Sequence, residues 1–568
     1  MRLKILKIII ICCFVILVLG LGHLQIVRGS FYESLGIHNC IRVVPVEPNR
    51  GRIFDRNGIV LADTQVSFDV MVVPQEIKDQ EKIFSFLSKT LGVEKKKLLG
   101  LYQKRKLASF APVTIAEDIA RDQAIVLEEN KFRYSGLLVE VRSKRRYPWG
   151  EIGAHVLGYV GRVSPERAEQ FKNYGYTIEG MTGYSGLEEY YDSFLRGKEG
   201  GVQIEVNNRG QQVRLLGMKV AAPGQDITTT LDLRIQQVAQ NLLAGERGVV
   251  VVMNLDSGEI LGMVSAPSFD PNAFLSSASS KQRASYFTNV DAVLLNRAIR
   301  GQYPPGSVFK IPIAIAALHT KKLTPRTSFL CNGFYTLGNR VFRCSHAHGV
   351  QDFTQAIAHS CNVYFFHTGL ILGPKIIEEY ARLFGLGALT NIDLPYEEKG
   401  NIPRSDLFAK RRWSKGDTLN FSIGQGDLLV TPIQLLKMMA VVARDGKDIL
   451  PSVIQFIGPS PVRREATLRT LDIPKMYFDK VKVGMRGAVA DEAGTARVLL
   501  RDDVVVFGKT GTAQSSGNKP HHAWFVGFCP QAKTRIVFCV FLENGGSSYN
   551  ACRVAADLLK EMKLQDIL

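Results

Sequence analysis

The sequence predicts an α+β protein whose C-terminal half contains a five-stranded antiparallel sheet with helices covering its faces. At 568 residues the chain is too long for a single hydrophobic core, so two or more domains are expected. One apolar run near the N-terminus is long enough to cross a bilayer. Five β-rich runs with a spacing that suits antiparallel pairing lie at 248–253, 260–266, 504–514, 523–528 and 536–541.

The membrane segment comes first in the chain. Residues 8–27 form an apolar run of about 20 residues, the length of a transmembrane helix. Three basic residues and no acidic one precede this run, so residues 1–7 should form a cytoplasmic tail, with the rest of the chain outside the inner membrane, in the periplasm or at the cell exterior. A cleaved signal peptide is the alternative, because Gly20 and Gly22 imitate a cleavage site. The apolar run continues beyond them, which favours an uncleaved single-pass anchor.

The formal net charge of +18 is scattered in short clusters such as Lys95–Lys97, Lys144–Arg146 and Lys410–Arg412. Each cluster is most simply a solvated face. Together they suit a protein that works near anionic lipid or an anionic cell-wall polymer. No nucleic-acid recognition motif is present, so nucleic acid is not expected as a partner.

A turn that leads into an apolar helix carries the first chemical signal. Residues 303–310 read Tyr-Pro-Pro-Gly-Ser-Val-Phe-Lys, and residues 311–318 are apolar. The prolines cannot continue a helix, so Ser307 should lie where a turn becomes a helix, with Lys310 beside it three residues later. A serine needs a base to become a nucleophile, and a lysine with a lowered pKa is a suitable base. Pro312 should tighten or bend this helix.

Alone, Ser-x-x-Lys is a weak signal, and Ser516–Lys519 matches it in a Gly-rich loop. Two further motifs follow in order, Ser360-Cys361-Asn362 and then Lys509-Thr510-Gly511-Thr512. This ordered set resembles the three motifs of penicillin-binding proteins and serine β-lactamases.

The resemblance assigns a role to each motif residue. It implies that Ser307 is the nucleophile, Lys310 its base, Ser360 a proton relay and Asn362 a contact to a substrate amide. On the expected strand, Lys509 should orient a terminal carboxylate, and Thr510 or Thr512 should bind it. Gly511 should let the substrate backbone approach the strand. The N–H groups of Ser307 and Thr512 are implied as the oxyanion hole.

The resemblance covers nearly the whole chain. Residues 50–62, 146–148, 154–159 and 183–188 resemble the non-catalytic pedestal of class B penicillin-binding proteins. Asn296-Arg297-Ala298 and Gly424-Gln425-Gly426 look most like elongation-type penicillin-binding protein 2. The implied domains are a pedestal at 41–225, of the dimerisation type, and a transpeptidase domain at 226–568 with the penicilloyl serine transferase fold. His155, which lies in one of the pedestal segments, is expected to be a packed structural histidine.

The implied function is peptidoglycan D,D-transpeptidation during elongation, by a serine acyl-enzyme that β-lactams also acylate. The alternatives are a D,D-carboxypeptidase, an anchored β-lactamase and a β-lactam sensor of the same fold. The implied partners are stem peptides, β-lactams, a membrane glycan polymerase of the shape, elongation and division family, and a periplasmic elongation scaffold. The chemistry requires no cofactor.

Nine cysteines are unusual for a chain placed outside the cytoplasm. Cys331, Cys344, His348 and Cys361 form a candidate tetrahedral Cys3His zinc site, since Cys344 and His348 are four residues apart. His346 is nearly as well placed as His348. Such a site should brace the Ser360–Asn362 segment from behind. A Cys331–Cys344 disulfide and unlinked thiols are the alternatives.

Overall fold

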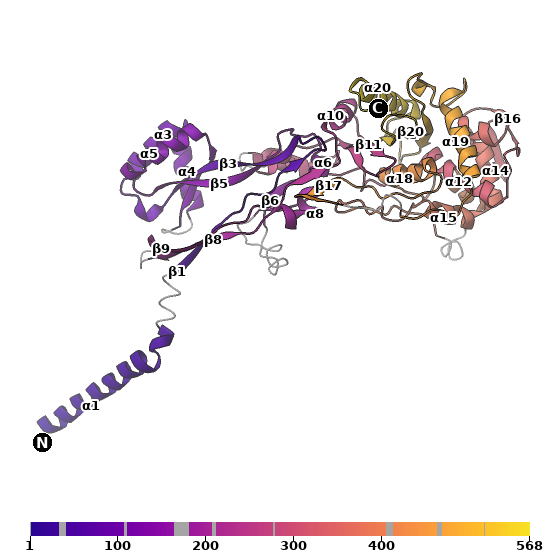
Figure 1. The fold of residues 1–568 in the computed structure, drawn as a ribbon. Coiled ribbons are helices and arrows are strands. Elements are labelled where there is room, and N and C mark those ends of the chain that lie inside the picture. The colour runs from indigo at the N-terminus through magenta and orange to yellow at the C-terminus, as the bar shows by residue number, and fades with distance from the viewer. Residues whose placement is uncertain are drawn as a thin grey trace. The chain divides into compact units, whose positions relative to one another are not determined.

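The computed structural model describes residues 2–32, 41–106, 111–163, 181–206, 212–275, 279–404, 413–462, 468–515 and 517–568 (Figure 1). The basic cluster at 410–412 and Ser516 of the second Ser-x-x-Lys match lie outside this part of the chain. The described chain divides into two compact units, each built from separate stretches of sequence. Unit 1 comprises residues 1–50, 64–144 and 196–224, and unit 2 comprises residues 51–63, 145–195 and 225–568.

The division differs from the domain limits expected from the sequence. Residues 51–63 and 145–195 were expected in the pedestal, yet they group with the C-terminal unit. The physical reason is their apolar side chains: Ile53, Val156 and Leu187 belong to the same buried core as the helices around Ser307.

The N-terminal segment is a helix, as expected. Helix α1 (Arg2–Gly22) continues as a π-helical turn, η1 (His23–Val27). The apolar stretch Leu3–Val27 has a mean hydropathy of 3.0 over its best window, none of which is buried in the protein. A 25-residue helix of this kind fits a single-pass membrane anchor.

Unit 1 contains two small sheets. One has the order β1 (Ile41–Val46), β8 (Gly200–Val206) and β9 (Gln212–Lys219). In the other, the distal part of β3 (Val60–Val72) pairs with β4 (Val113–Ile119) and β5 (Leu137–Arg146). Helices α3 (Gln80–Leu91), α4 (Lys95–Arg105) and α5 (Arg121–Asn130) pack on it around a core that includes Phe84, Leu87 and Leu127.

The five predicted strands of unit 2 form one antiparallel sheet, which confirms the prediction. Its order is β12 (Ile260–Ala266), β11 (Gly248–Asn254), β21 (Ile536–Leu542), β20 (His522–Cys529) and β19 (Phe507–Ala513). Successive side chains of a strand point to opposite faces, so Val249 and Val251 enter one core and Val250 and Val252 the other. Strand β19 lies at an edge of the sheet.

One face of the sheet is covered by α18 (Pro432–Ala443), whose N-cap is Thr431. The other face is covered by α10 (Leu233–Leu242) and the C-terminal helix α20 (Ser548–Leu564) (Figure 1). The helix after Ser307, α12 (Lys310–His319), packs mainly against other helices, and residues 310–318 are all buried.

Those other helices are α14 (Asn362–Leu372), α15 (Pro374–Leu383) and α19 (Lys475–Ala490). The segment before α14 consists of α13 (Phe353–Ala358), strands β13 (Phe329–Cys331) and β16 (Gly349–Gln351), and the hairpin of β14 (Phe334–Leu337) and β15 (Arg340–Arg343).

The first pedestal-like motif is structural. Strand β2 (Ile53–Phe54) pairs with the start of β3 and with β10 (Ile227–Thr229), all within unit 2. The buried Asp55 carboxylate accepts hydrogen bonds from the backbone N–H groups of Asn57 and Ile59, each 2.8 Å away. This carboxylate therefore holds the turn between the two strands.

His155 is the structural residue that the sequence predicts. It is buried, and its Nε2 lies 2.8 Å from the Val293 carbonyl oxygen. Burial lowers the pKa of His155 to about 4, so its imidazole is neutral at pH 7.

Candidate active site

Ser307 lies on a tight helical turn. Residues Gly306–Phe309 form a 3-10 helix, η7, and α12 begins at Lys310. Residues three apart eclipse one another in a 3-10 helix, so Ser307 and Lys310 lie on the same side. Pro312 falls in the first turn of α12, where its missing N–H has no intrahelical acceptor to lose. The tight turn η7 lies before Pro312, and α12 continues past Pro312 to His319.

Three glycines without a Cβ let this turn approach the edge strand β19 and the Gly424 segment closely. A Cβ on Gly306, whose φ is +55°, would lie 2.7 Å from the Thr512 carbonyl oxygen. A Cβ on Gly424 would lie 2.1 Å from the Gly306 carbonyl oxygen, and one on Gly511 would lie 2.9 Å from that of Pro305. The role expected for Gly511 therefore needs correction. The space beside it is filled by the protein's own turn and by Trp524, so Gly511 permits packing of that turn.

Lys310 is buried at the centre of the site. Its Nζ donates to the Ser360 carbonyl oxygen and to Asn362 Oδ1, each 2.7 Å away, and lies 3.4 Å from Ser360 Oγ. Burial lowers the pKa of Lys310 to about 8. The thiols of Cys344 and Cys361 act in the opposite direction and raise it. A pKa near the working pH suits a residue that must both accept and return a proton.

Ser360 ends helix α13 in a strained conformation. The Cys361 N–H donates to the Ala356 carbonyl at 3.0 Å, and the Ser360 N–H donates to that of Ile357 at 3.3 Å. These bonds form a Schellman cap, in which the residue at the Ser360 position is usually glycine. Ser360 has a φ of +57°, in the left-handed region that disfavours a side chain. A hydroxyl is thus held at a position where folding alone favours glycine.

Asn362 is the first residue of α14 and makes contacts at both ends of its amide. Its Oδ1 accepts from Lys310, and its Nδ2 donates to the Arg343 carbonyl at 3.1 Å. The Asn362 backbone N–H points to Cys344 Sγ at 3.1 Å. In this state Asn362 orients Lys310, and its expected contact to a substrate amide remains a prediction.

The strand motif separates its two threonines. Thr510 is buried and its Oγ1 donates to Thr495 Oγ1 at 2.9 Å, whereas Thr512 is exposed. Lys509 is fully buried, and burial together with the charge of Lys310 lowers the pKa of Lys509 well below its usual range. Of the two hydroxyls, that of Thr512 is the one open to a substrate.

Two contacts of this strand were missed from the sequence. Thr495 Oγ1 lies 3.4 Å from the Ala358 carbonyl oxygen, so Thr495 links the strand to the helix before Ser360. Gln425 Nε2 lies 3.4 Å from the Thr512 carbonyl oxygen. The Gly-Gln-Gly segment around Gln425 was a signal of family only, and nothing in the sequence pointed to Thr495.

The predicted metal ligands lie together. Donor atoms of Cys331, Cys344, His348 and Cys361 all lie within 4.8 Å of one another. Strand pairing aligns Cys331 with Gly349, which brings His348 beside it. His348 Nδ1 is 3.5 Å from the sulfurs of both Cys331 and Cys344. In a tetrahedral zinc site, bonds of about 2.1 Å to nitrogen and 2.3 Å to sulfur give an N···S separation of roughly 3.6 Å. The donor set therefore fits zinc, with His348 and not His346 as the histidine.

The thiols of this group are polarised. The contact with Cys361, and after it the Asn362 N–H, hold the pKa of Cys344 far below that of an ordinary thiol, to about 3. The same contact raises the pKa of Cys361. All the cysteines of the described chain are free thiols, among them these three. A thiolate at Cys344 is the form of cysteine that binds a metal.

Two models of known protein families match the chain. Residues 248–562 match the family model of the penicillin binding protein transpeptidase domain, and residues 45–229 match that of the penicillin-binding protein dimerisation domain. Over 96% of its length, the chain is 31% identical to the peptidoglycan D,D-transpeptidase MrdA of Haemophilus influenzae, covering 88% of that protein.

Two solved structures are similar over most of the chain. One is the penicillin-binding protein PBP2 of Helicobacter pylori in complex with MreC, with a TM-score of 0.79 and 28% identity over 93% of this chain and 100% of that one. The other comes from a peptidoglycan synthase complex that coordinates polymerization and crosslinking, with a TM-score of 0.76 and 29% identity over 99% and 98% of the two chains.

Proposed function

The chain belongs to the penicillin-binding protein transpeptidases, and on that premise we propose that Ser307 is its nucleophile and Lys310 the general base. The protein is a serine-type peptidoglycan D,D-transpeptidase of cell-wall elongation. The observation that carries the residue assignment is the state of Lys310. Its amine is buried among neutral oxygens, has a pKa of about 8, and lies on the same side of η7 as Ser307.

The first half-reaction is acylation. Ser307 Oγ attacks the carbonyl carbon of the penultimate D-alanine of a stem peptide, and its proton passes to Lys310 Nζ. The peptide bond breaks, the ester to Ser307 forms, and D-alanine leaves after its amine receives a proton. Ser360 Oγ, 3.4 Å from Lys310 Nζ, is the relay for that proton.

The second half-reaction transfers the acyl group. An amine of a neighbouring stem attacks the ester carbonyl, gives up a proton through the same Lys310–Ser360 pair, and leaves a new peptide bond and a free Ser307 hydroxyl. In both steps the N–H groups of Ser307 and Thr512 hold the developing oxyanion. The Gly306–Thr512 approach supports this pairing, because it brings the two backbones into contact.

Substrate binding falls to strand β19. Its free edge offers backbone groups with which an extended stem peptide pairs. The exposed Thr512 hydroxyl binds the terminal carboxylate, with Lys509 beneath it as the source of positive charge in its protonated form. Thr510 acts indirectly, because its hydroxyl is bonded to Thr495.

The partners follow from the relatives. The Helicobacter pylori PBP2 was solved with MreC, and another similar chain belongs to a synthase complex that polymerizes and crosslinks peptidoglycan. We propose that unit 1 binds a periplasmic scaffold and a membrane glycan polymerase of the shape, elongation and division family, with α1 as the membrane anchor and unit 2 outside. Deletion of residues 64–144 should leave penicillin labelling intact while cell elongation fails.

The reaction is tested by its product. Purified full-length protein with its polymerase partner and lipid-linked substrate should release cross-linked stem dimers after muramidase digestion, and Ser307→Ala should release none. Loss of D-alanine without dimers would identify a D,D-carboxypeptidase. Penicillin hydrolysis without dimers would identify a β-lactamase, and stable penicillin labelling with neither product would identify a sensor.

We also propose structural zinc at Cys331, Cys344, His348 and Cys361. Bound there, zinc would neutralise the thiolates and fix the segment that carries Ser360 and Asn362, without contacting substrate. Protein purified without added metal should contain about one zinc per chain, and Cys331→Ser together with His348→Ala should lose it. Metal-free protein with two thiols missing from a count under denaturing conditions would identify the Cys331–Cys344 disulfide instead.

A further inference from the structure

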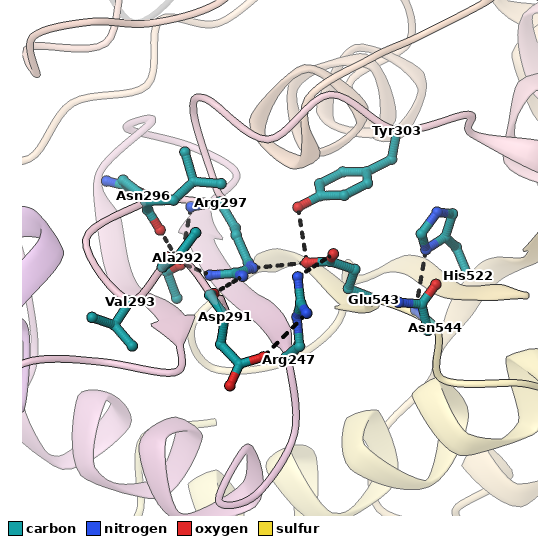
Figure 2. A network of polar contacts seen from close by, with 12 residues as sticks. Arg247, Asp291, Ala292, Val293, Asn296, Arg297, Tyr303, His522, Glu543 and Asn544 are labelled. Carbon is teal, nitrogen blue, oxygen red and sulfur yellow. Dashed lines mark hydrogen bonds and ion pairs between the residues drawn. The ribbon is translucent and has the colours of Figure 1, made fainter. Parts of the chain in front are cut away.

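A cluster of charged side chains around the buried Arg297 lies beside the segment that leads to Ser307, and the reaction steps above do not use it. Its centre is Glu543, which follows strand β21. The Glu543 carboxylate accepts from Arg297 Nε at 2.9 Å and from Arg247 at 2.6 Å. The Tyr303 hydroxyl donates to the same carboxylate at 3.4 Å. Figure 2 shows both guanidinium groups and the Tyr303 hydroxyl converging on Glu543.

Further hydrogen bonds hold the two arginines of the cluster in place. Arg297 is fully buried, and its remaining donors bond the carbonyl oxygens of Asp291 at 2.5 Å and Ala292 at 3.3 Å. Arg247 also contacts the Asp291 carboxylate at 3.2 Å. A buried arginine with every nitrogen bonded cannot change its orientation without losing several bonds. The Glu543 carboxylate is therefore a fixed point within unit 2.

Tyr303 begins the segment that ends at Ser307. Its backbone pairs in both directions with Val430, at 2.9 Å each way. Trp524 Nε1 then donates to the Pro304 carbonyl at 3.1 Å, and the Gly306 N–H donates to that of Gly424 at 3.0 Å. The Tyr303 hydroxyl adds a side-chain tether from this segment to the charged cluster, on the side away from α12.

We propose that Glu543, Arg297 and Tyr303 are positioning residues for Ser307, which set its Oγ against Lys310 and the oxyanion donors. The proposal rests on the assignment of Ser307 as the nucleophile. Nucleophilic attack needs near-attack geometry, and a displacement of about 1 Å can cost about 100-fold in rate. Two prolines and a tight turn transmit a shift of Tyr303 to Ser307, because they leave the segment few free torsions.

The test uses Tyr303→Phe, which removes the hydroxyl and keeps the ring in its contact with Phe541. Full-length protein in detergent is labelled with a fluorescent penicillin over a range of concentrations. The time courses give a maximal acylation rate and a half-saturating concentration. We expect the maximal rate to fall about 10-fold with the half-saturating concentration unchanged, because positioning acts on the chemical step. Glu543→Gln, which removes the charge that orients both arginines, should lower the rate at least as far.

Tyr380→Phe is the matched control. Tyr380 is also buried in unit 2, and its hydroxyl shares a 2.6 Å hydrogen bond with Nδ1 of His319, which lies at the opposite end of α12 from Lys310. Tyr380→Phe should lower the melting temperature at least as much as Tyr303→Phe and leave the acylation rate unchanged. The proposal would be overturned if Tyr303→Phe kept the wild-type maximal rate or changed only the half-saturating concentration. It would also be overturned if Tyr380→Phe lowered the maximal rate equally. Labelling that persists in Ser307→Ala would instead overturn the nucleophile assignment.

Discussion

Two groups of cationic side chains in unit 2 have opposite surroundings. Behind the Ser307 turn, Arg297 and Arg247 are paired with the Glu543 carboxylate. In the site, Lys310 bonds neutral oxygens of Ser360 and Asn362, and Lys509 Nζ donates to the Thr510 carbonyl. Burial among neutral groups lowers the pKa of both lysines.

The arginines paired with Glu543 have a structural role, whereas Lys310 is a reactive group. A buried ion pair with further hydrogen bonds is rigid, and removing one partner leaves an uncompensated charge. A buried lysine among neutral oxygens costs stability in its protonated form, and that cost is what makes its amine a base. The reactive lysine therefore lies where its amine bonds neutral oxygens and burial lowers its pKa.

The largest expected effect comes from replacing one member of each group by methionine. Lys310→Met should lower penicillin acylation by more than about 1,000-fold and leave the melting temperature unchanged or higher, since it removes a desolvated amine. Arg297→Met should instead destabilise the protein by about 3–5 kcal/mol, because Glu543 loses its fully buried cationic partner. Labelling kinetics and thermal unfolding of the two variants measure both effects. Equal destabilisation by both substitutions would contradict the comparison.

The pH dependence of acylation and of stability should reflect the lowered pKa of Lys310. Below the Lys310 pKa of about 8 the acylation rate should rise about tenfold per pH unit, and it should level off above that pH as the neutral amine becomes the main form. The folded pKa of Lys310 lies below the ordinary lysine value of 10.5. The unfolded chain therefore binds more protons between these values, and the Lys310 contribution to stability rises with pH across that window. Rates and unfolding free energies measured from pH 6 to 10 (about 0.5-unit steps) test it, and a flat rate profile would exclude Lys310 as the base.

The smallest expected effect concerns Ser360, whose backbone has a φ of +57°. Ser360→Gly removes the side chain that this conformation disfavours and should stabilise the protein by about 1 kcal/mol. It also removes the proton relay, so cross-linking should be lost. Ser547→Gly, at the N-cap of α20, serves as the control. It should destabilise by a few tenths of a kcal/mol. Unchanged cross-linking in Ser360→Gly would remove Ser360 from the mechanism.

Each catalytic motif is a short local pattern, and the order of the three motifs along the chain was sufficient to identify the family. Ser307, Ser360 and Lys509 each stand in a short pattern that can be recognised without knowing where the chain goes. The five strands were also predicted within a few residues, since a run such as 248–253 is apolar on both faces and has to be buried. The candidate metal ligands could be grouped because only a few cysteines and histidines lie near one another in the sequence.

Tertiary structure decided what each of these residues touches. Gly511 and Thr510 looked like substrate contacts, but Gly511 faces the Pro305 carbonyl and Thr510 bonds Thr495. Residues 51–63 and 145–195 join the C-terminal unit because their apolar side chains fit its core. The sequence by itself determined the chemistry available and the elements that carry it, since both depend on neighbours along the chain. The lowered pKa of Lys310 and the fixed position of Glu543 arise from groups tens to hundreds of residues away, and only folding brings those groups together.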